Sequence, residues 1–151
     1  MMAGARVGHL GWRGHAAIGF VSVLAVLPHP VSAQSTLAVA IEEARVAWRD
    51  HRVTALVSKS DTIRLHLPGI AMSASLRPGQ ASKLLREFLE NAEELEFELR
   101  NVRQLADDHA YAEMTRVYVI KGTTEKRTET VFLGFRVLGG QWSLREVRIT
   151  P

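Results

Sequence analysis

The stretch that decides the fold runs from Gly139 to Leu144 and reads Gly-Gly-Gln-Trp-Ser-Leu. Two consecutive glycines supply the positive φ angles of a two-residue β-hairpin turn. Residues 128–138 before the turn and residues 142–149 after it are rich in the β-branched and aromatic residues of strands. The stretch therefore predicts an antiparallel hairpin at the end of the chain.

Two more strands are predicted upstream of this hairpin, at residues 94–100 and 111–120. In the first of them, Leu95, Phe97 and Leu99 alternate with charged residues, so we expect these three to share one face. The strands at 111–120 and 128–138 carry apolar residues on both faces, which is typical of central strands covered on both sides. Residues 94–150 thus predict a four-stranded antiparallel meander.

Three helices are predicted before the meander. Apolar residues recur at spacings of three and four over residues 37–48, 53–57 and 81–89. We expect Ser35 or Thr36 to cap the first helix. Pro78 suits the first turn of the third helix, because its missing N–H would have no partner there. The apolar stripes of these helices require a sheet to cover them.

A short hairpin is predicted between the second and third helices. Residues 61–67 alternate strictly between apolar and polar, as in a half-buried strand. Pro68 and Gly69 form a turn, and residues 70–76 are expected to return as the partner strand. The predicted fold class is α+β, with N-terminal helices and a short hairpin packed on a curved antiparallel sheet.

The first 33 residues have the pattern of a secretory signal peptide. Arg6 and Arg13 precede an apolar run at residues 16–27, and Val31-Ser32-Ala33 provides small residues at a cleavage site. The apolar run is too short to span a bilayer. We therefore expect cleavage after Ala33 and a single domain, residues 34–151, that is soluble in the periplasm or outside the cell and holds no membrane contact.

The composition of the chain bears on nucleic-acid, metal and cofactor binding. The chain of 151 residues has a formal net charge of +3, but Arg6 and Arg13 lie in the leader, so the remainder is close to neutral and no nucleic-acid partner is expected. Cysteine is absent. His51, His66 and His109 have no paired spacing, and zinc requires three or four convergent ligands. No metal and no cofactor are therefore expected.

The order of elements resembles that of the nuclear transport factor 2-like superfamily, a cystatin-like α+β cone roll. Residues 61–69 resemble the Asp-x-Val-x-x-His-x-Pro-Gly stretch of its polyketide-cyclase-like members. Residues 79–88 and 139–149 together are similar to the bacterial family known as domain of unknown function 4783, whose members are small exported single-domain proteins. The resemblance implies fold and export, and no established activity.

The predicted ligand-binding residues lie on the meander. Arg116 and Tyr118 share one face of a strand, and Arg136 is expected to neighbour them on the next strand. With Trp142, these residues suit a small apolar or carboxylate ligand, because a guanidinium is a planar two-pronged donor. The alternative is that the arginines are solvated charges on the outer sheet face, or form cross-strand pairs with Glu113, Glu129 and Glu146.

Two functions from different classes remain open, together with a third that is purely structural or envelope-associated. The leading hypothesis is a non-catalytic exported domain that binds a ligand or presents its sheet to a partner, as a homodimer through the open sheet face. The alternative is an enzyme of the isomerase, cyclase or dehydratase kind, in which His66 acts with Asp61 or Tyr118. Surface placement of His66 and a turn role for Asp61 are the competing interpretations.

The interior of the cone distinguishes these hypotheses. If Trp142, Phe97 and Phe135 fill the space between the third helix and the meander, the domain has a packed core there and no small-molecule site.

Overall fold

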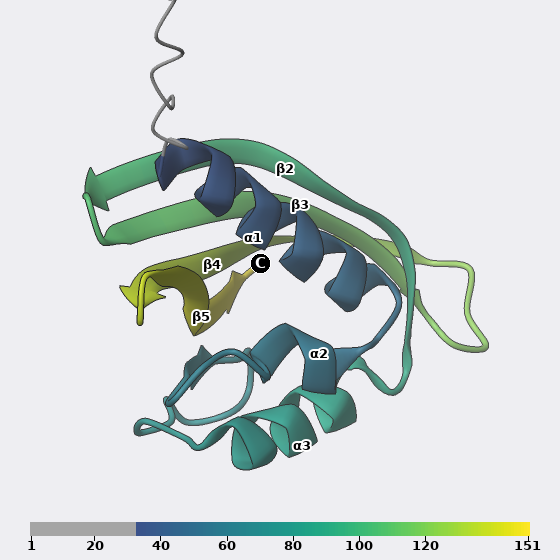
Figure 1. The fold of residues 1–151 in the computed structure, drawn as a ribbon. Helices are drawn as coiled ribbons and strands as arrows, with labels where there is room; N and C mark the ends of the chain where they lie inside the picture. Colours follow the sequence, from purple (N-terminus) through teal and green to yellow (C-terminus); the bar gives the residue numbers. More distant parts are fainter. Residues whose placement is uncertain (1–32) are drawn as a thin grey trace, which may run out of the picture. The chain divides into compact units, whose positions relative to one another are not determined.

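The computed structural model describes residues 33–151, with side chains described from residue 36 onward. The first elements are α1 (Ala33–Arg49), α2 (Val53–Val57), β1 (Arg64–His66) and α3 (Pro78–Leu89). Four long strands follow, β2 (Ala92–Ala106), β3 (His109–Ile120), β4 (Lys126–Leu138) and β5 (Gln141–Thr150) (Figure 1). The predicted leader lies outside the described residues, except for Ala33.

Helix α1 begins earlier than predicted. Ser35 and Thr36, expected as caps, lie in its first turn, because the helical backbone starts at Ala33, ahead of the apolar stripe. The stripe itself is confirmed, since Leu37, Ile41 and Trp48 are buried.

The five strands form one sheet in the order β1-β5-β4-β3-β2. Strands β2 to β5 are the predicted antiparallel meander. Gly139 and Gly140 have φ angles of 58° and 80°, which confirms the two-residue turn between β4 and β5. Strand β1 pairs with β5 in parallel, so the sheet is mixed. The α+β class with helices packed on a curved sheet is confirmed.

The short hairpin differs from the prediction. Residues 70–76 do not form a strand, and pairing with residues 61–67 is reduced to one bridge between Ile63 and Leu76. Two contacts replace the missing strand: the Ser73 hydroxyl accepts a hydrogen bond from the Leu65 N–H at 2.9 Å, and the Ser73 N–H donates to the Leu65 carbonyl at 3.1 Å. A serine side chain that forms hydrogen bonds with the backbone in this way competes with the regular backbone hydrogen bonds of two paired strands.

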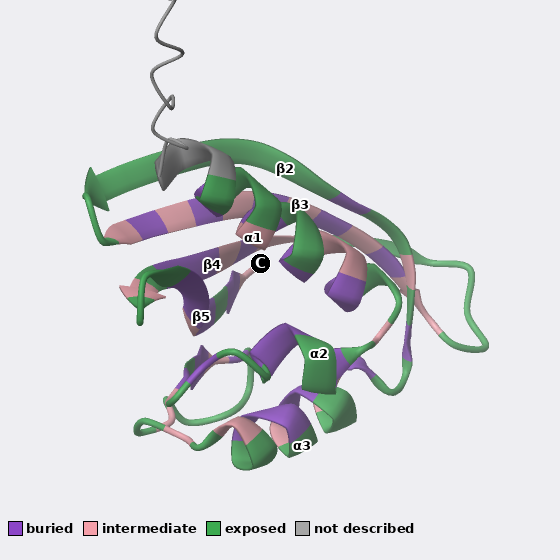
Figure 2. Cartoon of the chain, in the orientation of Figure 1, coloured by how far each residue is buried: buried purple, intermediate pink, exposed green. Residues whose placement is uncertain are grey.

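One face of the sheet is buried beneath the helices. Along β3, buried residues alternate with half-buried ones (Figure 2), which is the period of a strand with one covered face. Strand β2 breaks the expected alternation, because a register shift between Glu94 and Glu96 places an extra residue in the strand. Glu94 and Phe97 consequently face inward, and the prediction that Leu95 shares the face of Phe97 is wrong, since Leu95 is exposed.

Aromatic side chains fill the space between the helices and the sheet. Phe97, Phe135 and Trp142 are at most 5% exposed, and Trp48 of α1 stacks on Phe97 with ring centroids 4.9 Å apart. Leu85 of α3 is fully buried in the same cluster. This is the packed-core outcome that the sequence left open.

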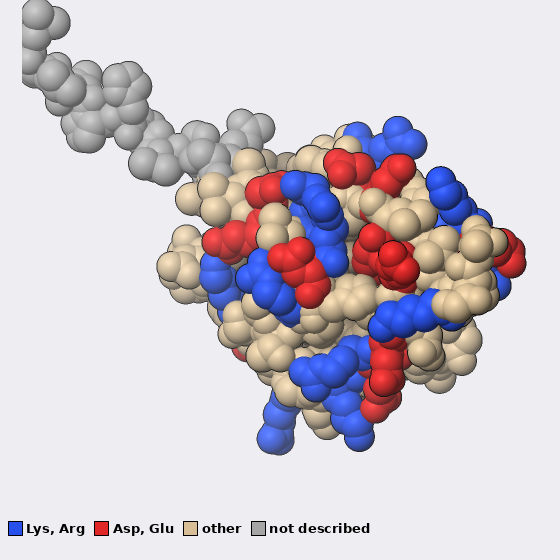
Figure 3. All heavy atoms as spheres, turned by 90° about the vertical axis from the view of Figure 1, so that its right-hand side faces the viewer, with Lys and Arg blue, Asp and Glu red and all other residues tan. Residues whose placement is uncertain are grey.

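The surface carries both signs of charge. In Figure 3, basic and acidic side chains are interspersed over the face that is shown. Within residues 33–151, no helix combines the length and the apolar character needed to cross a membrane.

Candidate functional site

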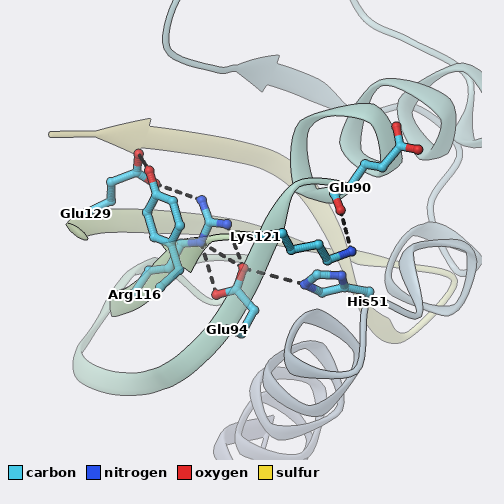
Figure 4. A network of polar contacts seen from close by, with 7 residues as sticks. His51, Glu90, Glu94, Arg116, Lys121 and Glu129 are labelled. Carbon is cyan, nitrogen blue, oxygen red and sulfur yellow. Dashed lines mark hydrogen bonds and ion pairs between the residues drawn. The ribbon is translucent and has the colours of Figure 1, made fainter. Parts of the chain in front are cut away.

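A buried arginine joins three strands on the inner face of the sheet. Arg116 of β3 is 1% exposed and lies between Glu94 of β2 and Glu129 of β4 (Figure 4). Its Nε donates to both oxygens of Glu94 at 3.0 and 3.1 Å, and its Nη2 donates to Oε1 of Glu94 at 2.6 Å. Nη1 donates to Glu129 at 2.8 Å. Every guanidinium nitrogen of Arg116 therefore already has a carboxylate partner.

Aromatic rings enclose this arginine. Its Cζ lies 3.9 Å from the centre of the Tyr118 ring, and the rings of Phe88 and Trp48 are within 5.7 Å. Such cation–π contacts strengthen where water is excluded. The Tyr118 hydroxyl donates to Glu129 at 2.9 Å. Burial, followed by this hydrogen bond, raises the pKa of Tyr118, so the phenol stays protonated at neutral pH.

His51 connects the buried network to the surface. It follows the last turn of α1 with a φ of 52°, in the left-handed region that residues other than glycine rarely adopt. The helix end is closed by hydrogen bonds from the Arg52 N–H to the Ala47 carbonyl and from the His51 N–H to the Trp48 carbonyl. The His51 Nε2 lies 3.6 Å from Glu94, and the side chain is partly exposed. His51 is thus the outermost member of the Arg116 network.

The Arg116 network has a structural role. A carboxylate ligand would have to displace Glu94 or Glu129 from Arg116, leaving a buried carboxylate unpaired. The arrangement therefore ties β2, β3 and β4 together beneath α1.

The predicted ligand-binding residues divide between two faces of the sheet. Arg116 and Tyr118 lie together on the inner face, as predicted. The expectation that Arg136 neighbours them is wrong: Arg116 lies opposite Glu129 in the β3–β4 register, whereas Arg136 lies opposite His109, seven residues further along β4. An odd separation along a strand reverses the side-chain direction, so Arg136 belongs to the outer face. The predicted cross-strand pair of Arg116 with Glu129 is present.

The residues of the enzymatic alternative do not converge. His66 lies on the outer face beside Glu146, with its Nε2 3.8 Å from the carboxylate. Asp61 is ion-paired with Arg145 and accepts a hydrogen bond from the Thr62 N–H. Tyr118 lies on the opposite, inner face of the sheet. His66 is half-buried, so it points neither into the helix-covered interior nor fully into solvent.

A groove that the sequence did not predict opens between α1, α2 and the β4–β5 hairpin. We call it the helix groove; its volume is about 710 Å³. Its floor is apolar and consists of buried residues from all four elements, namely Ala44, Ala47, Leu56, Phe135, Trp142 and Leu144. At the rim, Glu43 of α1 forms an ion pair of 2.5 Å with Lys59, which follows α2. The sequence signal is the number of alanines in α1, whose small side chains, with that of Ala55 in α2, leave this space open.

Trp142 is the predicted ligand-binding residue that lines the helix groove. It is 5% exposed, so it belongs to both the core and the groove floor. Among the described residues, no group of three or more histidine or acidic side chains is placed to hold a metal ion.

The fold is that of nuclear transport factor 2-like proteins. Solved structures with this fold include a domain of unknown function 4783 (DUF4783) family protein from Bacteroides ovatus ATCC 8483. It is 14% identical with a TM-score of 0.59, and the match covers 71% of this chain and 90% of that one. The resemblance noted from the sequence is confirmed at the level of the fold.

Two other similar structures carry different descriptions. A ketosteroid isomerase-like protein from Erwinia carotovora atroseptica SCRI1043 is 16% identical with a TM-score of 0.64, covering 78% of this chain and 96% of that one. A nuclear transport factor 2-like protein of unknown function from Pseudomonas putida KT2440 is 18% identical with a TM-score of 0.62, covering 78% and 85%. No family model matches the sequence, and no curated protein is similar to it. At these identities the similarity concerns the fold alone.

Proposed function

We propose that the protein is an exported, non-catalytic binding module that takes a small apolar ligand in the helix groove. The observation that carries this proposal is the apolar floor formed by Phe135, Trp142 and Leu144 beneath α2 and the alanine-rich helix α1. Ligand sites in proteins are typically concave and mostly apolar, with volumes of roughly 300–1,000 Å³. The helix groove, at about 710 Å³, falls in this range.

The polar groups near the groove favour binding over catalysis. A general acid or base must reach the substrate in the required protonation state. At the rim, Lys59 and Glu43 neutralise each other. Two other charged residues that line the groove are also paired, Glu42 with Arg45 and Arg52 with Asp50. The apolar floor therefore supplies affinity without an acid–base set beside it.

Filling the groove tests the proposal. Ala55 lines the groove and is exposed, so Ala55→Trp adds a large ring there without disturbing buried packing. We expect the uncharged apolar fluorophore N-phenyl-1-naphthylamine to bind the purified protein and Ala55→Trp to weaken this binding at least about tenfold. Ala74→Trp, at an exposed loop position outside the groove, is the matched control and should bind normally. Equal binding by both variants would contradict the proposal.

Export is part of the same proposal. The basic residues, apolar run and Val31-Ser32-Ala33 of the leader support it. Expressed in a bacterium with a secretion system, the protein should be recovered from the periplasm or medium with Gln34 as its first residue. Intact-mass measurement and N-terminal sequencing read this directly, and an uncleaved cytoplasmic product would overturn it.

We also propose a homodimer through the outer face of the sheet, at the end of β3 that carries Val117 and Val119, away from His109 and Arg136. On that face Val117 and Val119 of β3 and Thr130 of β4 are half-buried β-branched residues. Light scattering should give twice the chain mass, and Val117→Lys should shift the protein to the monomer because it brings a charge into the contact. A monomer at every concentration would remove this part of the proposal.

A further inference from the structure

We propose that a second groove, on the outer face of the sheet around Arg136, binds a small carboxylate. This arginine groove has a volume of about 260 Å³, and its lining includes Arg64, Arg136, Arg145, His109, Tyr111 and Glu146. It is independent of the helix groove, because it lies on the side of the sheet that the helices do not cover. A volume of this size holds several water molecules or one small organic acid.

A glycine forms the floor of the arginine groove. A Cβ added to Gly134 would lie 2.9 Å from Cε1 of Tyr111 and 3.1 Å from Cβ of Glu146. The absent side chain therefore lets the Tyr111 ring lie directly against β4. The Tyr111 hydroxyl is within 3.4 Å of Glu146, which fixes the ring as one wall of the groove. Any other residue at this position would push Tyr111 away and change the groove.

Two of the three arginines in the groove are already engaged. Arg64 donates to Glu146 at 3.1 Å, and Arg145 is paired with Asp61. Arg136 is exposed and makes no hydrogen bond or ion pair with any residue of the described chain. The groove therefore offers one unpaired guanidinium within a set of charges that is positive overall.

The geometry favours a carboxylate over a larger anion. A single guanidinium fork matches the two oxygens of a carboxylate in one plane. A phosphate dianion would need further unpaired cations, and Arg64 and Arg145 already have acidic partners. Hydroxyl groups of Thr62 and Ser75 also line the groove and can donate to the same ligand.

The apolar part of the ligand has a place beside Arg136. His109 lies directly opposite Arg136 in the β3–β4 register, and its ring is 5.2 Å from that of Tyr111 at an angle of 49°. The two rings form a tilted aromatic wall next to the free guanidinium. An aromatic or short aliphatic monocarboxylate therefore fits both features.

The test is a titration of the full-length protein with 4-fluorobenzoate at constant ionic strength, followed by fluorine and amide NMR. Binding at millimolar concentration should shift the amides of Gly134, Arg136 and His109. Arg136→Gln should weaken binding at least about tenfold, because hydrogen bonds to a charged group are lost. Arg127→Gln, an exposed arginine near the other end of the same strand, is the matched control and should bind like the wild type.

Two further measurements, with Arg136→Lys and with inorganic phosphate, test the kind of ligand that the arginine groove binds. Arg136→Lys keeps the charge but loses the fork, so intermediate binding supports planar recognition by the guanidinium, and full binding overturns that recognition. Inorganic phosphate that binds as tightly as 4-fluorobenzoate overturns the carboxylate assignment. Absence of binding, survival of binding in Arg136→Gln, or shifts confined to helix-groove residues such as Ala55 would overturn the site itself. None of these results depends on whether the helix groove binds a ligand.

Discussion

Arg116 is the residue on which the inner face of the sheet depends. Its side chain is buried against three aromatic rings and satisfied by two carboxylates from flanking strands. A buried ion pair of this kind contributes little relative to an apolar core, but removal of one partner leaves the other charge stranded in a medium of low polarity. Substitution of Arg116 should therefore be strongly destabilising.

Arg116→Met should lower the free energy of unfolding by about 3–5 kcal/mol, because Glu94 would remain buried and unpaired. Urea unfolding measures the change. Adding Glu94→Gln to Arg116→Met should recover part of the loss. The exposed Arg136→Gln variant is the control and should lie within about 0.5 kcal/mol of the wild type. A wild-type midpoint for Arg116→Met would contradict the assigned role.

Tyr118 gives the stability a dependence on alkaline pH. Its pKa is raised from 10.0 in the folded state, so the folded protein holds the phenolic proton more tightly than the unfolded chain does. The stabilisation that this difference in pKa gives the folded state is fully present below pH 10, and it is lost as the pH rises through the higher pKa of the folded state. Tyr118→Phe should therefore flatten the decline in unfolding free energy above pH 10.

The free energy of unfolding of Tyr118→Phe at neutral pH is compared with that of the wild type as a reference. There the variant should lose about 0.5–1.5 kcal/mol through the missing hydrogen bond to Glu129. Tyr111 also has a raised pKa, caused first by burial and then by Glu146, so some alkaline decline should persist in the variant. An unchanged alkaline slope would show that Tyr118 does not titrate in the folded protein.

At the level of elements, the end of α1 combines backbone closure with a side-chain contact to Glu94. His51 adopts a positive φ that suits glycine, yet its ring reaches Glu94. A non-glycine residue in this region costs about 1 kcal/mol. The chain accepts this strain at the point where the helix meets the Arg116 network.

His51→Gly and His51→Ala separate strain from contact, because both remove the imidazole and only glycine relieves the backbone. We expect the glycine variant to be more stable than the alanine variant by about 1 kcal/mol. Thermal and urea unfolding of the two variants, measured side by side, give this difference. Equal stability would mean that the positive φ costs nothing here.

The elements themselves were largely predictable, because their signals are local. Spacing of apolar residues placed the helices, and Gly139-Gly140 placed the last turn. The irregularity at Leu95 was not predictable, since a bulge leaves no trace in the alternation of one strand. It is this bulge that turns Glu94 inward, so Glu94 was missed as a partner of Arg116, although the pairing with Glu129 and the shared face of Arg116 and Tyr118 were predicted.

The pairing of β1 with β5 was not predictable from the sequence for a related reason. The parallel partner of β1 is β5, which lies about eighty residues later in the chain: Leu65 is opposite Val147. Nothing in the alternation of residues 61–67 distinguishes this partner from a neighbouring strand, so a local hairpin was predicted instead. The helix groove was missed because its space depends on how two helices pack against the β4–β5 hairpin.

For the molecule as a whole, the sheet order predicts a gradient of local stability. Strands β3 and β4 are paired on both sides along most of their length, β5 is paired with β1 over three residues only, and β1 and β2 form the edges. In hydrogen exchange, amides of β3 and β4 near Met114 and Val131 should be the slowest, and amides of β2 beyond Leu99 should be among the fastest of the strands. Uniform protection across all five strands would contradict this order.

The irregular edge of β2 also bears on behaviour at high concentration. This strand of 15 residues presents one side without a neighbouring strand, and its register shifts at Glu94/Glu96, Leu99/Asn101 and Gln104/Ala106. A second chain that tried to extend the sheet there would meet hydrogen-bonding groups at broken intervals, and it would bring charged side chains into apposition. Concentrated solutions should therefore remain free of fibrils and turbidity, even though the domain carries a long strand at its border.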